Sequence, residues 1–162
     1  MLHKLQQRKD AGFTIIEVMI VLAIAGLIML IVFLAVPALQ RNSHNTTRKN
    51  DIGRVGSAVN DWVSNNNGTV FTAGTGNANL STVKNDAGAL GQYTLTEGTN
   101  FKVATGTQSA LSGSGSVDNV IVVTGAQCGS NGATTAGTSR QMSIQYMLES
   151  SDGNGIPACQ NI

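Results

Sequence analysis

The sequence FTIIEVMIVLAIAGLIMLIVFLAVPAL, residues 13–39, decides what kind of protein this chain is. Within it, residues 18–39 contain no charged side chain. As an α-helix they would measure about 33 Å, enough to cross a bilayer hydrocarbon core of about 30 Å. A core helix of a soluble protein is a poor alternative, because such helices are rarely apolar on every face for about six turns. We therefore expect a membrane-spanning helix.

The residues before this helix are also compatible with a secretory signal, because Lys4, Arg8 and Lys9 precede the apolar segment. A secretory apolar region, however, has about 7–15 residues before a small-residue cleavage site. The present segment is longer and contains an acid, Glu17, near its start. Basic residues flank both of its ends, so the positive-inside rule does not choose an orientation. We place the N-terminus in the cytoplasm because the C-terminal part has the composition of an exported domain.

Glu17 is the charged residue inside this apolar sequence. A carboxylate deep in a membrane helix costs several kcal/mol unless it is paired. In one interpretation Glu17 lies at the interface, where its side chain reaches water. In the other it needs a cation, and cleavage after Gly12 would create one, the α-amino group of Phe13, which is mostly protonated near neutral pH. This amine does not easily reach Glu17 of its own helix, so we expect it to meet Glu17 of a neighbouring copy and to set the stagger between copies.

The order of these residues resembles the processing motif of type IV prepilins. Basic leader residues are followed by Gly12, then Phe13, three residues, Glu17 and a long apolar helix. The resemblance implies that a prepilin peptidase cuts between Gly12 and Phe13 and N-methylates Phe13, and that Glu17 contacts the Phe13 amine of a neighbour. It also implies a helix that loosens or bends at Gly26 and Pro37, although this proline comes later than is usual in the family.

Two cysteines, Cys128 and Cys159, lie near the C-terminal end. From the residues alone they are either two unrelated buried thiols or one disulfide formed in an oxidising compartment. The resemblance implies the disulfide, since many pilins close a C-terminal loop in this way. Chain entropy gives such a crosslink a stabilisation of about 3–4 kcal/mol if its geometry is unstrained.

The composition argues against several other classes of protein. Charged residues make up 12% of the chain and the net charge is +1, which does not favour nucleic acid as the main partner. The histidines are His3 and His44, so no nucleophile–base pair can be built in the C-terminal part, and we expect no enzyme. Zinc-ligand spacing is absent, and we expect no metal or cofactor. The loop at 152–155 lacks the other acids of a calcium loop, and we interpret it as a turn.

We expect four segments along the chain. They are a leader at 1–12, a transmembrane and filament-core helix at 13–39, an amphipathic continuation at 40–64, and a globular head at 65–162. The continuation has one apolar helical face, formed by Ile52, Val55, Val59, Trp62 and Val63. The sequence at 65–68, three asparagines and a glycine, predicts the end of the helix.

The head is predicted to contain a short helix at 78–90 and strands at 100–105, 117–124 and 140–149. Alternation in the last strand places four apolar side chains on one face, which we expect to lie on the amphipathic helix, and leaves the other face mostly polar. The apolar face consists of Met142, Ile144, Tyr146 and Leu148. The predicted fold is α+β, with a long N-terminal helix packed on a small antiparallel sheet, as in type IV pilins.

We therefore interpret the chain as a major type IV pilin, held in the cytoplasmic membrane as a precursor and then polymerised into an extracellular pilus. Its expected partners are copies of itself, the prepilin peptidase, the assembly platform with its ATPases, and the membrane before assembly. Nucleic acid enters only as secondary cargo. The tasks that the resemblance implies are adhesion, twitching motility and DNA uptake. The alternatives are a type II secretion pseudopilin, a minor pilin, and a single-pass anchored binding domain that does not polymerise.

Overall fold

The computed structural model describes residues 12–72, 77–112 and 117–162. Its elements, in chain order, are α1 (Ile15–Asn65), α2 (Asn77–Ala87), β1 (Phe101–Thr105), β2 (Val120–Thr124), β3 (Ala126–Cys128), the 3-10 turn η1 (Ser130–Gly132), β4 (Thr134–Ala136), β5 (Met142–Leu148) and β6 (Ile156–Asn161). The chain divides after Leu39 into two compact units, and α1 contributes to both.

Helix α1 runs without interruption past Pro37, as the sequence predicted. Its C-terminal end is also where we expected it. The backbone N–H of Gly68 donates to the Val63 carbonyl oxygen at 2.9 Å, and Asn67 and Gly68 have φ angles of 56° and 74°. This left-handed backbone ends the helix because it satisfies a carbonyl of the last turn.

The N-terminal part of α1 is exposed along its length. The helix is long and apolar enough to cross a membrane, and none of its most apolar 18-residue window is buried within the chain. Large apolar side chains are exposed to solvent from Phe13, which is 88% exposed, to Leu39, which is 70% exposed. An apolar surface of this extent requires lipid or another protein molecule to cover it.

The main sheet has the strand order β1-β2-β5-β6, and β3 and β4 form a separate antiparallel pair. Strand β5 pairs antiparallel with both β2 and β6. Strands β1 and β2 are parallel, however, with Phe101 opposite Val120. The pilin-like α+β class is confirmed, but the sheet is only mostly antiparallel. Parallel neighbours cannot be joined by a tight hairpin, and a longer connection runs between these two strands.

Most of the predicted elements are present with shorter bounds. The helix expected at 78–90 is α2, which ends at Ala87 because Gly88 takes a left-handed φ of 70°. The three predicted strands correspond to β1, β2 and β5. Strands β3, β4 and β6 were not predicted. Strand β4 and the turn η1 lie in the glycine-containing segment 129–137, for which no regular element was predicted.

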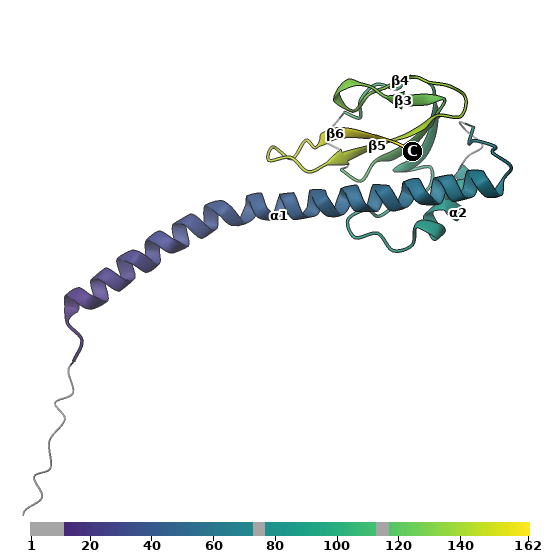
Figure 1. Ribbon diagram of the computed structural model, residues 1–162. Helices are drawn as coiled ribbons and strands as arrows, with labels where there is room; N and C mark the ends of the chain where they lie inside the picture. The colour runs from purple at the N-terminus through teal and green to yellow at the C-terminus, as the bar shows by residue number, and fades with distance from the viewer. Residues whose placement is uncertain (1–11, 73–76, 113–116) are drawn as a thin grey trace, which may run out of the picture. The chain divides into compact units, whose positions relative to one another are not determined.

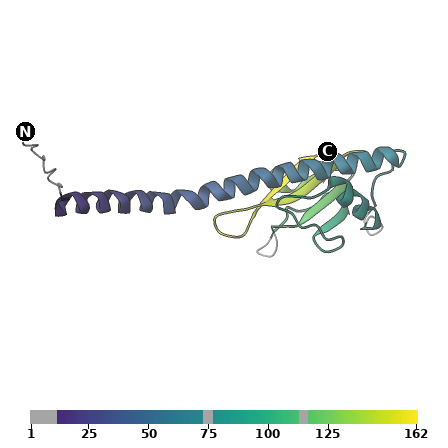
Figure 2. The same cartoon turned by 90° about the horizontal axis from the view of Figure 1, so that it is seen from below.

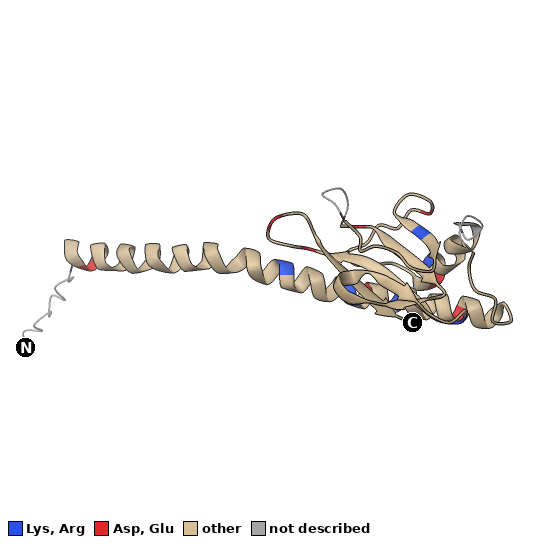
Figure 3. Cartoon of the chain, turned by 90° about the horizontal axis from the view of Figure 1, so that it is seen from above, with Lys and Arg blue, Asp and Glu red and all other residues tan. Residues whose placement is uncertain are grey.

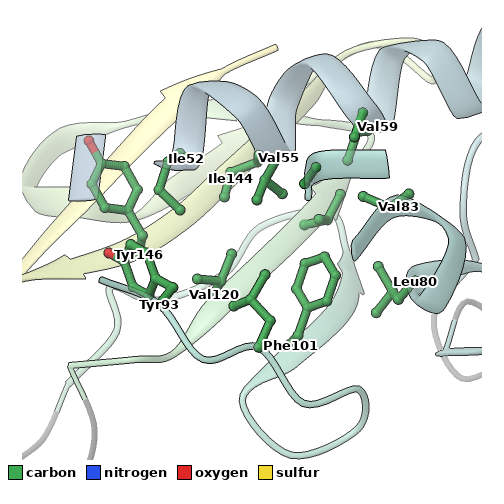
Figure 4. Close-up of a cluster of buried hydrophobic side chains, with 14 of the residues drawn as sticks. Ile52, Val55, Val59, Leu80, Val83, Tyr93, Phe101, Val120, Ile144 and Tyr146 are labelled. Atoms are coloured by element: carbon green, nitrogen blue, oxygen red, sulfur yellow. The ribbon is translucent and has the colours of Figure 1, made fainter. Parts of the chain in front are cut away.

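The C-terminal part of α1, the main sheet and the β3–β4 pair follow one another as layers (Figure 1). In Figure 2, seen from below, α1 crosses in front of the yellow C-terminal strand β6. The main core lies between α1, α2 and one face of the sheet (Figure 4). Its fully buried side chains include Ile52, Val55, Val59, Leu80, Val83, Phe101, Val120 and Ile144. Each contributes about 1.5–3 kcal/mol by burial. Trp62 is partly buried against this core and stacks on Phe71, with ring centroids 4.2 Å apart.

The second face of β5 is mostly polar, as expected, yet it is not open to water. Ser143 and Gln145 are fully buried. The side-chain amide of Gln145 donates to the carbonyl oxygens of Ser109 and Gly132, at 3.0 and 2.8 Å. The layer that carries β3, β4 and η1 therefore covers this face, and β5 is a central strand with protein on both sides.

Candidate processing and assembly site

The N-terminal end of α1 is closed by a reciprocal set of hydrogen bonds between Thr14 and Glu17. The backbone N–H and the hydroxyl of Thr14 donate to Oε2 of Glu17, at 2.9 and 2.8 Å. The backbone N–H of Glu17 donates in return to the Thr14 hydroxyl, at 3.3 Å. This arrangement is a capping box, which satisfies backbone donors that a helix start otherwise leaves unpaired. A cap of this kind stabilises a helix start by about 1 kcal/mol.

The capping box uses only one oxygen of the Glu17 carboxylate. Both Thr14 donors reach Oε2, and Oε1 receives no hydrogen bond from residues 12–72, 77–112 or 117–162. Sequence reasoning missed this pair, although a threonine three residues before a glutamate at a helix start is the signature of a capping box. In the uncleaved chain Phe13 has a peptide nitrogen and no amine, so the cation expected to pair with Glu17 arises only after cleavage.

The expected cleavage position is accessible. Gly12 and Phe13 are exposed and precede the first helical residue. A Cβ added to Gly12 would meet no heavy atom within 4 Å, and its backbone is not left-handed. The part of the fold that the structure describes therefore does not require glycine at position 12. The basic leader residues Lys4, Arg8 and Lys9 lie outside the described residues.

Gly26 and Pro37, where the helix was expected to loosen or bend, both lie inside α1. A Cβ on Gly26 would meet nothing within 4 Å, so no packing among the described residues explains the glycine. Glycine in a helix interior costs about 1 kcal/mol relative to alanine. Pro37 removes the hydrogen bond that its nitrogen would donate to the Phe33 carbonyl. The helix is thus continuous here but intrinsically weaker at these two positions.

Beyond the apolar segment, Arg48 attaches α1 to the head. Its buried guanidinium donates to the Val117 carbonyl oxygen at 2.8 Å and to Asp118 at 3.3 Å, and lies 3.5 Å from Glu149. It also lies 4.7 Å above the ring of Tyr93. Burial raises the pKa of Tyr93 to about 12, although hydrogen bonding and charge from Arg48 oppose the rise. A buried ion pair of this kind fixes position more reliably than it adds stability.

Two neighbours of Arg48 on α1 also hold Glu149. Nδ1 of His44 lies 3.1 Å from its carboxylate. The side chain of Asn45 exchanges two hydrogen bonds with the Glu149 backbone, donating to the carbonyl at 3.0 Å and accepting from the N–H at 2.7 Å. The end of β5 is therefore clamped onto the first turns of α1 in the head.

The disulfide between Cys128 and Cys159 is present. It joins β3 to the edge strand β6, so it ties the two sheets together. The backbone N–H of Cys128 also donates to the side chain of Asn161 at 2.7 Å. These contacts hold β6 from the side that β5 does not cover.

The loop between β5 and β6 forms a turn around Asp152. The backbone N–H of Asn154 donates to the Asp152 carboxylate at 3.1 Å. Hydrogen bonds, first from Ser150 and then from Asn154, hold the pKa of Asp152 below its usual range. Among the described residues, no group of three acidic, histidine or cysteine side chains is placed to hold a metal ion.

Comparison with known families gives one match. The prokaryotic N-terminal methylation motif matches residues 7–33, a range that includes the expected cleavage position, Glu17 and most of the apolar helix. The match does not extend into the head. No curated protein and no solved structure matches the chain.

Proposed function

We propose that this chain, whose N-terminal methylation motif is the leader signature of the type IV pilin family, is the major subunit of a type IV pilus. The motif supports a pilin-like or pseudopilin precursor that a prepilin peptidase processes. The observation that carries the finer proposal is the exposed apolar surface along residues 13–39, on a chain whose head has a buried core of its own. A subunit of this form needs its own copies to cover that helix outside the membrane.

Cleavage is the first step. Hydrolysis of the peptide bond between Gly12 and Phe13 adds one water molecule and leaves a carboxylate on Gly12 and an ammonium group on Phe13. Nothing among the described residues requires glycine at position 12, and this supports a glycine requirement that is imposed by the peptidase, whose subsite would exclude larger side chains. We expect N-methylation of the new terminal residue, Phe13, to come next, and the match to the methylation motif supports this step.

Pairing of Glu17 with a neighbour's Phe13 is the second step. Lipid chains are as apolar as leucine side chains, so exchanging lipid for other copies gives little net free energy by burial alone. Packing and polar contacts must then decide assembly. The capping box leaves Oε1 of Glu17 available, and this oxygen can accept a hydrogen bond from the neighbour's ammonium group while the cap stays in place. Because the leader conceals the amine, cleavage would act as the switch for assembly.

Two features of the head favour a pilus subunit over a type II secretion pseudopilin, whose major members usually lack a C-terminal disulfide and carry a calcium loop. This chain has a disulfide between Cys128 and Cys159. Its Asp152 loop is a hydrogen-bonded turn. The intact Glu17 favours a bulk subunit over those minor, tip-initiating members that lack the acid. Adhesion, twitching motility and DNA uptake are the tasks of such a pilus.

The test compares two variants in cells that contain the assembly machinery. We expect Glu17→Val to insert and to be cleaved, yet to give no filaments in electron micrographs of sheared cell surfaces. Thr14→Val is the matched control, because it removes the side-chain cap but keeps the Glu17 carboxylate, and we expect it to assemble. Abundant wild-type-like fibres from Glu17→Val would refute the pairing. Equal failure of both variants would assign the role of Glu17 to helix capping.

A further inference from the structure

Arg41 is the first charged residue after Glu17 along α1. The 23 residues between them, 18–40, are all uncharged, and this part of the helix is bare of charge in Figure 3. They correspond to about 35 Å of regular helix, slightly more than a hydrocarbon core of about 30 Å. When this segment spans a bilayer, Glu17 and Arg41 therefore fall near its two opposite headgroup regions.

The structure distinguishes Arg41 from the other cations that follow the apolar segment. Arg48 is buried in the head, and His44 is held by Glu149. Lys49 is exposed but lies eight residues further on, about 12 Å along the helix. Arg41 is partly exposed and makes no hydrogen bond or ion pair with any residue that the structure describes. Its guanidinium is thus a free cation beside the apolar segment.

We propose that Arg41 binds the phosphate group of lipids in the outer leaflet while the chain awaits assembly. A guanidinium offers two parallel N–H donors to phosphate oxygens, and its long stem lets the charge reach the headgroups from a helix end in the bilayer. This contact would fix the depth of the helix. It would hold Glu17 at the inner headgroup region, where its carboxylate meets water.

Binding of Arg41 to lipid phosphate would determine at which stage, in the membrane or in the fibre, Glu17 needs a cationic partner. In the membrane, a Glu17 held at the interface is capped by Thr14 and hydrated, so it needs no cation. Extraction from the bilayer removes both the Arg41–phosphate contact and the water around Glu17. Pairing is then required in the fibre. This inference depends on membrane insertion but not on polymerisation, so either can fail without the other.

The contact is measurable in the full uncleaved chain, reconstituted in vesicles of phosphatidylcholine and phosphatidylglycerol. Arginine is labelled with ¹³C at the guanidinium carbon, and Arg8 is replaced by lysine so that the leader contributes no signal. The dephasing of the ¹³C signal by lipid ³¹P in solid-state NMR reports a guanidinium in contact with phosphate. We expect dephasing in the parent chain and its loss in Arg41→Gln.

Arg54→Gln is the matched control. Arg54 lies on the same helix but donates to the Ala89 carbonyl oxygen in the head, so its removal should leave the dephasing unchanged. Dephasing that survives Arg41→Gln would overturn the proposal. A second arm uses maltoside micelles with added inorganic phosphate. Dephasing there as strong as in vesicles would assign the contact to free phosphate and would equally overturn binding to lipid.

Discussion

Removal of the disulfide between Cys128 and Cys159 should destabilise the head by about 3–4 kcal/mol. The two cysteines are 31 residues apart in sequence, and the loop-closure entropy for that length corresponds to about 3.7 kcal/mol at 25 °C. The structure indicates that few other contacts would replace the stabilisation lost with the disulfide. Strand β6 keeps its pairing with β5, but its other side is tied to β3 through the disulfide and the Asn161 side chain.

The assay is urea unfolding of the double variant Cys128→Ala/Cys159→Ala, as the full chain in maltoside micelles. Trp62 is the single tryptophan and stacks on Phe71, so its fluorescence reports loss of the core. With a urea m-value of about 1–3 kcal/mol/M, the midpoint should fall by roughly 1–4 M. Wild-type protein in reductant should match the variant, which itself should not respond to reductant. A loss of less than about 1 kcal/mol would refute the reasoning, because β6 would then be held without the crosslink.

Three further predictions concern the cleavage position, the buried tyrosine and the η1 glycine. Gly12→Val should leave the precursor uncleaved, seen as an unshifted band on a gel, whereas a band of mature size would place the glycine requirement outside the peptidase. Burial raises the pKa of Tyr93 from 10.0 to about 12, so between these pH values the folded head keeps a proton that the unfolded chain releases. The free energy of unfolding should therefore be unaffected by Tyr93 below pH 10 and should fall above it, by roughly 2 kcal/mol as pH 12 is approached. Urea unfolding from pH 8 to pH 11 should show this fall, and Tyr93→Phe should reduce it to the part that comes from Tyr146, whose pKa burial also raises; an identical fall in that variant would contradict the assignment. Gly132 and Gly153 have the same φ of 77°, but a Cβ on Gly132 would lie 2.7 Å from the Pro157 carbonyl carbon, whereas Gly153 is open. Gly132→Ala should therefore lower the free energy of unfolding, measured with urea, by about 1–3 kcal/mol more than Gly153→Ala does. Equal losses would show that β6 can shift to accommodate the added methyl group.

The elements predicted correctly are those whose signal is local and long. Helix α1 is apolar and then amphipathic over its whole length, and its asparagine- and glycine-rich end is a strong stop signal. Strand β5 shows a regular alternation, and its apolar face does pack on α1. Strands β3 and β4 have three residues each and no apolar pattern, so their pairing is set by tertiary contacts. Strand β6 contains Pro157 and Cys159, and its position depends on β5 and on the disulfide.

The burial of Gln145 could not be predicted, because an alternating polar residue ordinarily faces water. It is covered by a layer whose strands were themselves not recognised. At the N-terminus, by contrast, the local sequence contained the signal for the observed contact. The resemblance to prepilins predicts roles for Gly12, Phe13 and Glu17, and these roles stay predictions. The local signature that pairs Thr14 with Glu17 was also present in the sequence. A glutamate inside an apolar segment fits two patterns at once, a charge in the membrane and the acidic residue of a capping box, and the apolar surroundings favour the first.

The central claim, that Glu17 pairs with the Phe13 amine of a neighbouring copy, is tested most directly by a distance measurement in assembled fibres. Half of the copies would carry ¹⁵N-phenylalanine and the other half ¹³C-glutamate, so that any ¹³C–¹⁵N dipolar contact joins different chains. We predict a contact between the N-terminal nitrogen of Phe13 and the Glu17 carboxylate carbon. No contact in these mixed fibres, or one seen only when both labels are on the same chain, would contradict the claim.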